Sequence, residues 1–128
     1  MERQVVPADS PMAATVGYSR AVRVGPHVHV AGTAPIMPGD ADPPPDAYAQ
    51  AKRCFEIMLA ALAELDAKPE HVVRTRAYLV DVDEWKDVGR AHGEVFGSVL
   101  PASAFVVVKS LLDPRWRVEV EADALVMP

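Results

Sequence analysis

The 128-residue sequence contains a single cysteine, Cys54, and no long apolar run. One cysteine excludes an internal disulfide and any zinc site built on cysteines, and it fits a reducing compartment. A membrane span needs about 20 consecutive apolar residues, and residues 1–12 carry Glu2 and Asp9 where a signal peptide would be apolar. We therefore expect a cytoplasmic protein with no membrane partner.

The sequence has no excess of basic residues. It contains 13 Lys and Arg against 18 Asp and Glu, a net charge of −5, whereas a nucleic-acid partner favours a basic surface that releases counterions. A glycine-rich phosphate loop and a serine-centred nucleophile elbow are also missing. We expect no nucleic-acid partner, which leaves acid–base chemistry on small molecules, or binding alone.

Hydrophobic residues make up 50% of the sequence and charged residues 24%, which is typical of a globular chain. The length fits one domain over residues 1–128. Five of the twelve prolines lie in residues 35–45, which we expect to form a loop.

Hydrophobic periodicity predicts five strands and two helices. The strands are expected at residues 21–24, 27–31, 72–80, 104–108 and 118–126. One helix is expected to begin at Asp46 and end before Pro69. The other follows a capping-box spacing at Asp81 and Glu84 and ends at Gly97. The order β-β-α-β-α-β-β predicts an α+β fold with one sheet and two helices on one face.

Two helices cover only one face of such a sheet. Residues 105–108 read Phe-Val-Val-Val and are apolar on both faces of their strand, so the uncovered face is expected to meet another surface. Because most soluble oligomers are homo-oligomers, we expect a second copy of this chain there.

Carboxylates alternate with apolar residues along the last strand. Glu119, Glu121 and Asp123 are expected on one face, roughly 6.5–7 Å apart. One interpretation is a strand face exposed to water. The other is that one carboxylate, at a subunit boundary where water is restricted, acts as an acid or base or holds a water.

Two further features are open to a functional or a structural interpretation. Arg115 and Arg117 flank Trp116. They could hold an anionic ligand while the indole stacks on it, or pair with Glu119, Glu121 or Asp113 on the surface. Gly32, followed by Thr33, could let a ligand approach the backbone, or mark a bulge.

The histidines and the cysteine favour structural interpretations. His27 and His29 share a strand face, but no third ligand lies near them in the sequence, so we expect no metal site. His71 and His92 are isolated and are expected to pack in the core or on the surface. Cys54 lies among apolar helix residues and is expected to act as a small hydrophobe.

Four motifs together resemble the YjgF/YER057c/UK114 family, also called the Rid family. Residues 18–25 (YSRAVRVG) and 28–35 (VHVAGTAP) resemble its opening. Residues 72–81 (VVRTRAYLVD) resemble its central strand and residues 118–122 (VEVEA) its closing strand. Each motif alone is weak, but their order is specific, and the resemblance covers residues 18–126.

The resemblance implies a chorismate-mutase-like α+β fold with a mixed sheet, assembled as a homotrimer with small-molecule sites between subunits. The best-understood members are cofactor-free deaminases that hydrolyse imines and enamines such as 2-aminoacrylate to a keto acid and ammonia. In those members an arginine holds the substrate carboxylate, backbone groups position the water, and a tyrosine and a glutamate complete the site.

Carried onto this sequence, the resemblance matches the family's tyrosine, glycine and glutamate with Tyr18, Gly32 and Glu119. Ser103 stands in place of the arginine, and Phe105 stands where cysteine is common. Serine cannot form a bidentate pair with a carboxylate, so we do not expect standard 2-aminoacrylate deamination.

Two compensations for the missing arginine remain open. Arg115, Arg117 or Lys109 could restore the positive charge. Alternatively, a pocket lined by Phe105 and by Trp85 or Trp116 could take a ligand without a carboxylate.

We expect a cofactor-independent enzyme that hydrolyses or tautomerises a small imine, enamine or related compound. The alternative is a non-catalytic trimer that binds a metabolite or partner in the same cleft. A ribonuclease role is disfavoured because the chain is acidic and shows no catalytic histidine pair. The expected catalytic residues are Glu119 and Tyr18, and the expected ligand-binding residues are Gly32, Thr33, Ser103, Phe105, Arg115, Trp116 and Arg117.

Overall fold

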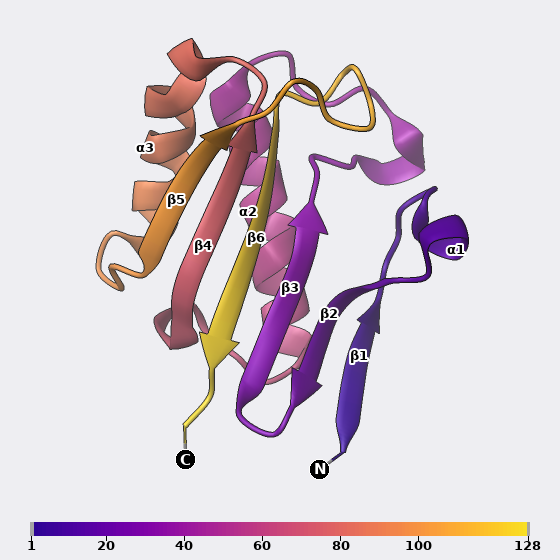
Figure 1. Ribbon diagram of the computed structural model, residues 1–128, viewed down its shortest axis with the longest axis vertical. Coiled ribbons are helices and arrows are strands. Elements are labelled where there is room, and N and C mark those ends of the chain that lie inside the picture. Colours follow the sequence, from indigo (N-terminus) through magenta and orange to yellow (C-terminus); the bar gives the residue numbers. More distant parts are fainter. Residues whose placement is uncertain (1, 128) are drawn as a thin grey trace.

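One mixed sheet organises the chain, and its strand order decides which side chains can meet. In the computed structural model, which describes residues 2–127, six strands follow the order β1-β2-β3-β6-β4-β5 (Figure 1). They are β1 Arg3–Pro7, β2 Ser19–Val24, β3 His27–Thr33, β4 Val72–Leu79, β5 Ala102–Val107 and β6 Val118–Leu125. β4 and β5 run parallel, and the other neighbouring pairs run antiparallel.

Two long helices, α2 (Ala47–Glu64) and α3 (Trp85–Phe96), cover one face of this sheet (Figure 1). α3 forms the crossover that the parallel β4–β5 pair requires. The short elements are α1 (Ala13–Val16) and the 3₁₀ turns η1 (Pro38–Asp40), η2 (Pro69–His71) and η3 (Val82–Glu84). The predicted α+β fold with two helices on one face is confirmed. Across residues 2–127, no helix is both long and apolar enough to cross a membrane.

The core lies between the helices and the covered face of the sheet. Phe55, Met58 and Leu62 of α2 are buried, as are Val118 and Val120 of β6. Burial of each such side chain contributes about 1.5–3 kcal/mol. The residues between the buried ones of β6 therefore point to the other side of the sheet, which we call the open face.

Strand β1 (Arg3–Pro7) was not predicted. It pairs antiparallel with β2 at the edge of the sheet, yet Val6 is its one buried residue. Backbone hydrogen bonds rather than a buried face hold it, so hydrophobic periodicity gives no signal for it. The other five strands agree with the prediction to within about two residues at each end.

The structure confirms the predicted N-terminal cap of α2 but not that of α3. The predicted cap of α2 is confirmed, because the Asp46 carboxylate accepts the backbone N–H of Ala49 at 3.0 Å. The predicted capping box before α3 is wrong. Asp81 accepts from the backbone of Asp83 and caps η3 instead, while the Glu84 carboxylate binds Arg117 at 2.7 Å.

Candidate functional site

Glu119 lies on β6 and points to the open face, where its carboxylate packs against the backbone of Gly32 at the end of β3. A β carbon built on Gly32 would fall 2.8 Å from Oε2 of Glu119, so the missing side chain makes room for this carboxylate. The pairing of β3 with β6 also shifts register between Val30 and Thr33. Gly32 thus lies in an irregular segment of β3, which agrees with the bulge, one of the two interpretations of this glycine. The space that a side chain would take at position 32 is filled by the Glu119 carboxylate.

The Glu119 carboxylate is half-buried, and no side chain or backbone group within residues 2–127 donates a hydrogen bond to it. Burial raises the pKa of Glu119 above its ordinary value, because removal from water disfavours the ionised form. The positive charge of Arg20 opposes this increase in pKa, and the negative charge of Glu121 adds to it. A carboxyl group with a raised pKa holds its proton more readily than an exposed one and can act as an acid or a base.

Arg20 was not among the predicted site residues. Its side chain is 6% exposed, and its Nη1 donates to the carbonyl oxygen of Gly32 at 2.6 Å and to Oγ1 of Thr33 at 3.0 Å. Its Nη2 lies 3.5 Å from the Tyr18 hydroxyl. A buried guanidinium therefore holds together the tyrosine and the glycine segment of the predicted site.

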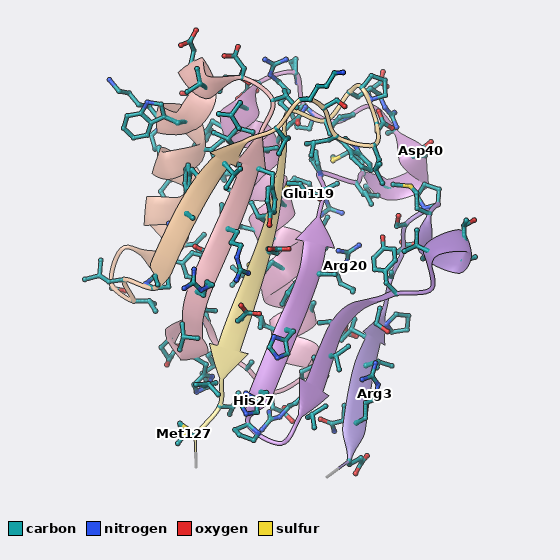
Figure 2. All side chains as sticks on the ribbon, viewed as in Figure 1. Arg3, Arg20, His27, Asp40, Glu119 and Met127 are labelled. Carbon is teal, nitrogen blue, oxygen red and sulfur yellow. The ribbon has the colours of Figure 1, made fainter. Side chains whose placement is uncertain are left out.

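These residues surround one cavity. Figure 2 shows Glu119 and Arg20 on either side of the end of β3. The cavity has a volume of about 160 Å³, and we call it the Glu119 cavity. Its lining includes Tyr18, Arg20, Gly32, Leu112, Trp116 and Glu119. The structure thus brings together four of the predicted site residues from distant parts of the sequence.

Thr33 lies on the other side of this strand segment. It is fully buried, donates to the carbonyl oxygen of Ala31, and lines an adjoining cavity of about 120 Å³ with Arg20 and Arg53. Its contact with the Glu119 cavity is therefore indirect, through the hydrogen bond that it accepts from Arg20.

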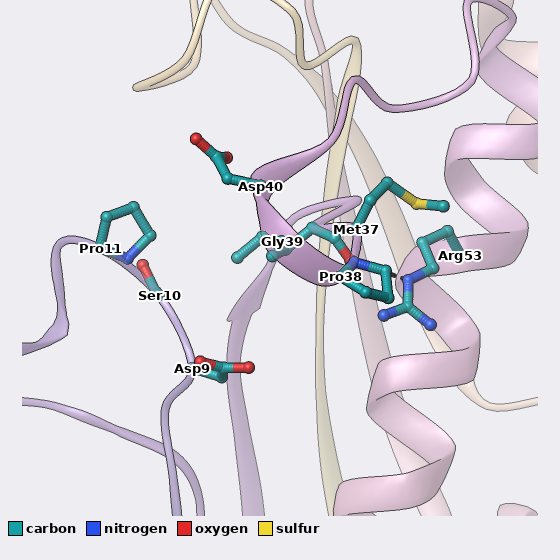
Figure 3. Close-up of a pocket in the computed structure, with 9 residues that line it drawn as sticks. Asp9, Ser10, Pro11, Met37, Pro38, Gly39, Asp40 and Arg53 are labelled. Carbon is teal, nitrogen blue, oxygen red and sulfur yellow. Dashed lines mark hydrogen bonds between the residues drawn. The ribbon is translucent and has the colours of Figure 1, made fainter.

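A wider hollow lies beside these two cavities, between the N-terminal segment and the turn η1. It has a volume of about 490 Å³. In Figure 3, Asp9, Ser10 and Pro11 face Pro38 and Asp40 across it. Arg53 and Ile36 also line this hollow, and Nε of Arg53 donates to the carbonyl oxygen of Ile36 at 2.8 Å.

Ser103 and Phe105 lie apart from the Glu119 cavity. Both belong to β5, which is separated from β6 by β4. The Ser103 hydroxyl accepts from Thr75 at 2.8 Å, and Phe105 packs edge-on against His92 with 6.0 Å between ring centroids. Both side chains therefore point toward α3, and a single chain does not bring them to Glu119.

The arginine pair before β6 is tied to neighbouring carboxylates. Arg115 lies within 3.1 Å of Asp40, Asp42 and Asp113, and these contacts raise the pKa of its guanidinium. Arg117 binds Glu84 at 2.7 Å. Both arginines therefore pair with carboxylates, which is one of the two interpretations of these residues. The predicted partner Asp113 is found for Arg115, whereas Arg117 binds Glu84 rather than Glu119 or Glu121.

The two tryptophans occupy different environments. Trp116 is 5% exposed and lines the Glu119 cavity. Trp85, at the start of α3, is 52% exposed and stacks beside Lys86. Of the two predicted pocket residues, Trp116 therefore contacts the cavity.

The rest of the open face carries a polar network next to Glu119. Glu121 accepts from the Tyr78 hydroxyl at 2.6 Å and from Arg76 at 3.2 Å. Nδ1 of His29 lies 2.7 Å from a carboxylate oxygen of Asp123. The three carboxylates of β6 therefore share one face, as predicted. Glu121 and Asp123 have side-chain partners, and within residues 2–127 Glu119 has none.

The histidine pair of β3 and the cysteine have surroundings that favour structural roles. The rings of His27 and His29 stack with 6.4 Å between centroids. Within residues 2–127, no group of three His, Cys, Asp or Glu side chains is placed to hold a metal ion. Cys54 is buried, and burial raises the pKa of its thiol well above the usual range, so the reactive thiolate is disfavoured.

Comparison with known proteins identifies the family. Residues 8–126 match the sequence profile described as Endoribonuclease L-PSP. The chain belongs to this family. An uncharacterized protein of Streptomyces coelicolor is 38% identical over 123 residues, which cover 93% of this chain and 89% of that protein.

Solved structures agree with this assignment. The crystal structure of a YjgF/YER057c/UK114 family member from Mycobacterium tuberculosis superposes with a TM-score of 0.87 and 41% identity, covering 98% of this chain and 100% of that one. The predicted membership of the YjgF (Rid) family is thus confirmed. TdcF of E. coli, solved with bound serine, shares the fold with a TM-score of 0.81 and 20% identity, covering 96% of this chain and 94% of that one.

Proposed function

We propose that this Rid-family protein is a cofactor-independent enzyme that hydrolyses or tautomerises a small imine, enamine or related carbonyl compound. The observation that carries the proposal is the state of Glu119. Its carboxylate is half-buried, its pKa is raised, and it borders a cavity beside Tyr18 and Gly32 without a hydrogen-bond donor among residues 2–127. An acid–base group with these properties suits repeated proton transfer.

Glu119 can serve both stages of imine hydrolysis. First it takes a proton from water as the oxygen forms a bond to the imine carbon, and it passes this proton to the nitrogen. A second transfer moves the hydroxyl proton to nitrogen, the C–N bond breaks, and ammonia leaves a carbonyl product. Imine and water thus give carbonyl compound and ammonia, while the carboxylate is regenerated. In tautomerisation the same group moves a proton between carbon and nitrogen.

Tyr18 and the backbone at Gly32 supply the remaining polar groups. The Tyr18 hydroxyl, on the cavity wall, can donate a hydrogen bond to the nitrogen or oxygen of the reacting centre. Backbone dipoles next to Gly32 are fixed by the strand and need no reorganisation during the reaction. That TdcF was solved with serine bound supports a small, polar ligand for the proposed site.

We also propose that the chain assembles as a homotrimer with its sites between subunits, as the family resemblance implies. β5 is an edge strand, and Val106 and Val107 on it are 42% and 52% exposed. An apolar edge next to an uncovered sheet face is a surface that proteins normally cover. In a trimer, β5 of a second copy could bring Ser103 and Phe105 to the Glu119 cavity.

A ribonuclease activity is a weaker proposal despite the name of the family profile. The chain has a net charge of −5, and the open face beside the cavity carries Glu119, Glu121 and Asp123. These carboxylates would repel the phosphates of RNA.

The test of the enzymatic proposal is ammonia release from freshly generated imines and enamines with acidic, apolar and carboxylate-free side groups. We expect wild-type protein to accelerate one class over the uncatalysed rate, and Glu119→Gln to lower kcat by about 100-fold or more. Glu121→Gln is the matched control, since Glu121 lies two residues away on the same strand face, and it should retain activity. Unchanged turnover by Glu119→Gln would refute the role of Glu119.

A second candidate function is binding without catalysis. The family resemblance aligns Ser103 with the arginine that holds the substrate carboxylate, and this expected loss favours binding alone, because a serine hydroxyl engaged by Thr75 cannot form a bidentate pair with a carboxylate. Saturable binding of a metabolite with no product, across all imine classes, would favour this function over the enzyme.

A further inference from the structure

Arg20 is a buried cation without an ion pair. Its side chain is 94% removed from solvent, since 6% is exposed, and within residues 2–127 no carboxylate oxygen lies within 4.0 Å of its nitrogens. A buried charge is costly unless hydrogen bonds or an opposite charge compensate for the lost water. Here the hydrogen bonds go to three neutral oxygens, of Gly32, Thr33 and Tyr18. The Glu119 carboxylate in the same cavity adds a longer-range attraction.

These three contacts leave part of the guanidinium available. An arginine side chain has five N–H donors. Two on Nη1 and one on Nη2 have acceptors, so among residues 2–127 the Nε donor and the second Nη2 donor have none. Nε and Nη2 form one edge of the guanidinium, and such an edge can hold a carboxylate through two parallel hydrogen bonds.

The neighbouring guanidinium groups of Arg115 and Arg117 already pair with carboxylates of the protein and are less available to a ligand. Arg115 is surrounded by three aspartates, and Arg117 is bound to Glu84 and lies 3.8 Å from Asp81. Arg20, in contrast, lines the Glu119 cavity directly. Two hydrogen bonds to the Gly32–Thr33 segment fix its position, so its remaining donors are held in place for an anion before the anion binds.

We propose that Arg20 binds the anionic group of the ligand in the Glu119 cavity and that this group is a small carboxylate. The inference deepens the proposed function, because it names the charged group of the substrate and the residue that selects it. It depends on the same cavity but not on turnover. Arg20 would thus carry the positive charge that Ser103 does not supply.

The test measures binding, independently of catalysis. Pyruvate and its uncharged methyl ester are titrated into wild-type protein, Arg20→Gln and Arg20→Lys, with affinity read by calorimetry and by NMR shifts of the Gly32 amide. Arg53→Gln is the matched control, because it removes the same charge from the adjoining cavity. We expect wild type to bind pyruvate about tenfold or more tightly than the ester.

Arg20→Gln should lower pyruvate affinity by about tenfold or more and leave ester affinity unchanged, while Arg53→Gln stays within about twofold of wild type. Equal pyruvate affinity in wild type and Arg20→Gln would overturn the proposal. If Arg20→Gln does not fold, wild type and Arg20→Lys decide the matter: equal binding of pyruvate and ester, or no binding of pyruvate, refutes it. Arg20-dependent binding without turnover of any imine would refute the enzymatic proposal alone.

Discussion

The carboxylate of Glu119 occupies the space that a side chain at position 32 would need, because a β carbon on Gly32 would lie 2.8 Å from Oε2. The atom it would meet is the far end of a flexible side chain. Glu119 can therefore swing away, at the cost of leaving its place beside Tyr18 and Arg20. A side chain at position 32 would therefore displace the Glu119 carboxylate from the site without requiring the backbone of the fold to move.

Gly32→Ala should consequently impair function more than stability. We expect its free energy of unfolding to stay within about 1 kcal/mol of wild type, while kcat for an identified substrate falls by about tenfold or more. Urea unfolding and steady-state kinetics measure the two effects.

Gly93→Ala provides the control for the glycine substitution. Gly93 lies in α3, and a β carbon there would have no neighbour within 4 Å. The Gly93→Ala substitution should stabilise the helix by about 0.5–1 kcal/mol and leave kcat unchanged. A Gly32→Ala protein with full activity would show that Glu119 does not need its observed position.

The stability of the Glu119→Gln variant should depend on pH in a defined direction. The pKa of Glu119 is raised in the folded chain, so its contribution to stability is fully present below the unfolded pKa and is lost as pH rises through the folded pKa. Glutamine remains neutral at every pH. We therefore expect Glu119→Gln to be more stable than wild type at about pH 8, with the difference shrinking toward about pH 4.

Urea unfolding at the two pH values and at one protein concentration measures this effect. Glu121→Gln should behave in the opposite way at pH 8, because Glu121 accepts hydrogen bonds from Tyr78 and Arg76 that the substitution weakens. A Glu119→Gln variant less stable than wild type at pH 8 would contradict the burial of an unfavourable charge.

Part of the site could be predicted from sequence because it follows strand alternation and family motifs. Buried and half-buried residues alternate along β6. This alternation places Glu119 and Glu121 on the open face, as the alternation in the sequence predicted. The resemblance matched Tyr18, Gly32 and Glu119 to one site, and the structure brings all three to one cavity.

Arg20 could not be predicted in this way. An arginine at the start of a strand normally reaches solvent, and its burial depends on where Gly32 and Thr33 lie in the neighbouring strand. The separation of Ser103 from Glu119 also depends on sheet order, since β4 lies between their strands. Strand order follows from long-range pairing, which periodicity along one chain does not encode.

Gln50 connects α2 to the segments that flank the cavity. It is buried, and its side-chain nitrogen donates to the carbonyl oxygens of Pro44 at 2.8 Å and Arg115 at 3.0 Å. Its side-chain oxygen accepts from the backbone of Arg117 at 2.8 Å. Trp116, a wall of the Glu119 cavity, lies between the two arginines.

Gln50→Leu should destabilise the fold by about 2–4 kcal/mol, because it leaves buried backbone groups without partners. Thermal and urea unfolding provide the measurement. Gln4→Leu, at an exposed position of β1, should change stability by no more than about 0.5 kcal/mol. Equal effects of the two substitutions would mean that water replaces the Gln50 bonds.

The proposed trimer makes a prediction about Ser103 that a single chain does not. If β5 of a second copy closes the Glu119 cavity, an arginine introduced at position 103 reaches the same anion as Arg20. We expect Ser103→Arg, added to Arg20→Gln, to restore about tenfold of the lost pyruvate affinity. Calorimetric titration of the single and double variants measures the rescue.

Ser103→Ala in the same Arg20→Gln background is the control for this rescue. Both substitutions remove the hydroxyl that accepts from Thr75, so they share the loss of this hydrogen bond and differ in the size and charge of the new side chain. Ser103→Ala should restore nothing. Because Ser103 and the cavity lie on strands separated by β4 in one chain, rescue by arginine alone would require the neighbouring subunit, and its absence would contradict a site shared between subunits.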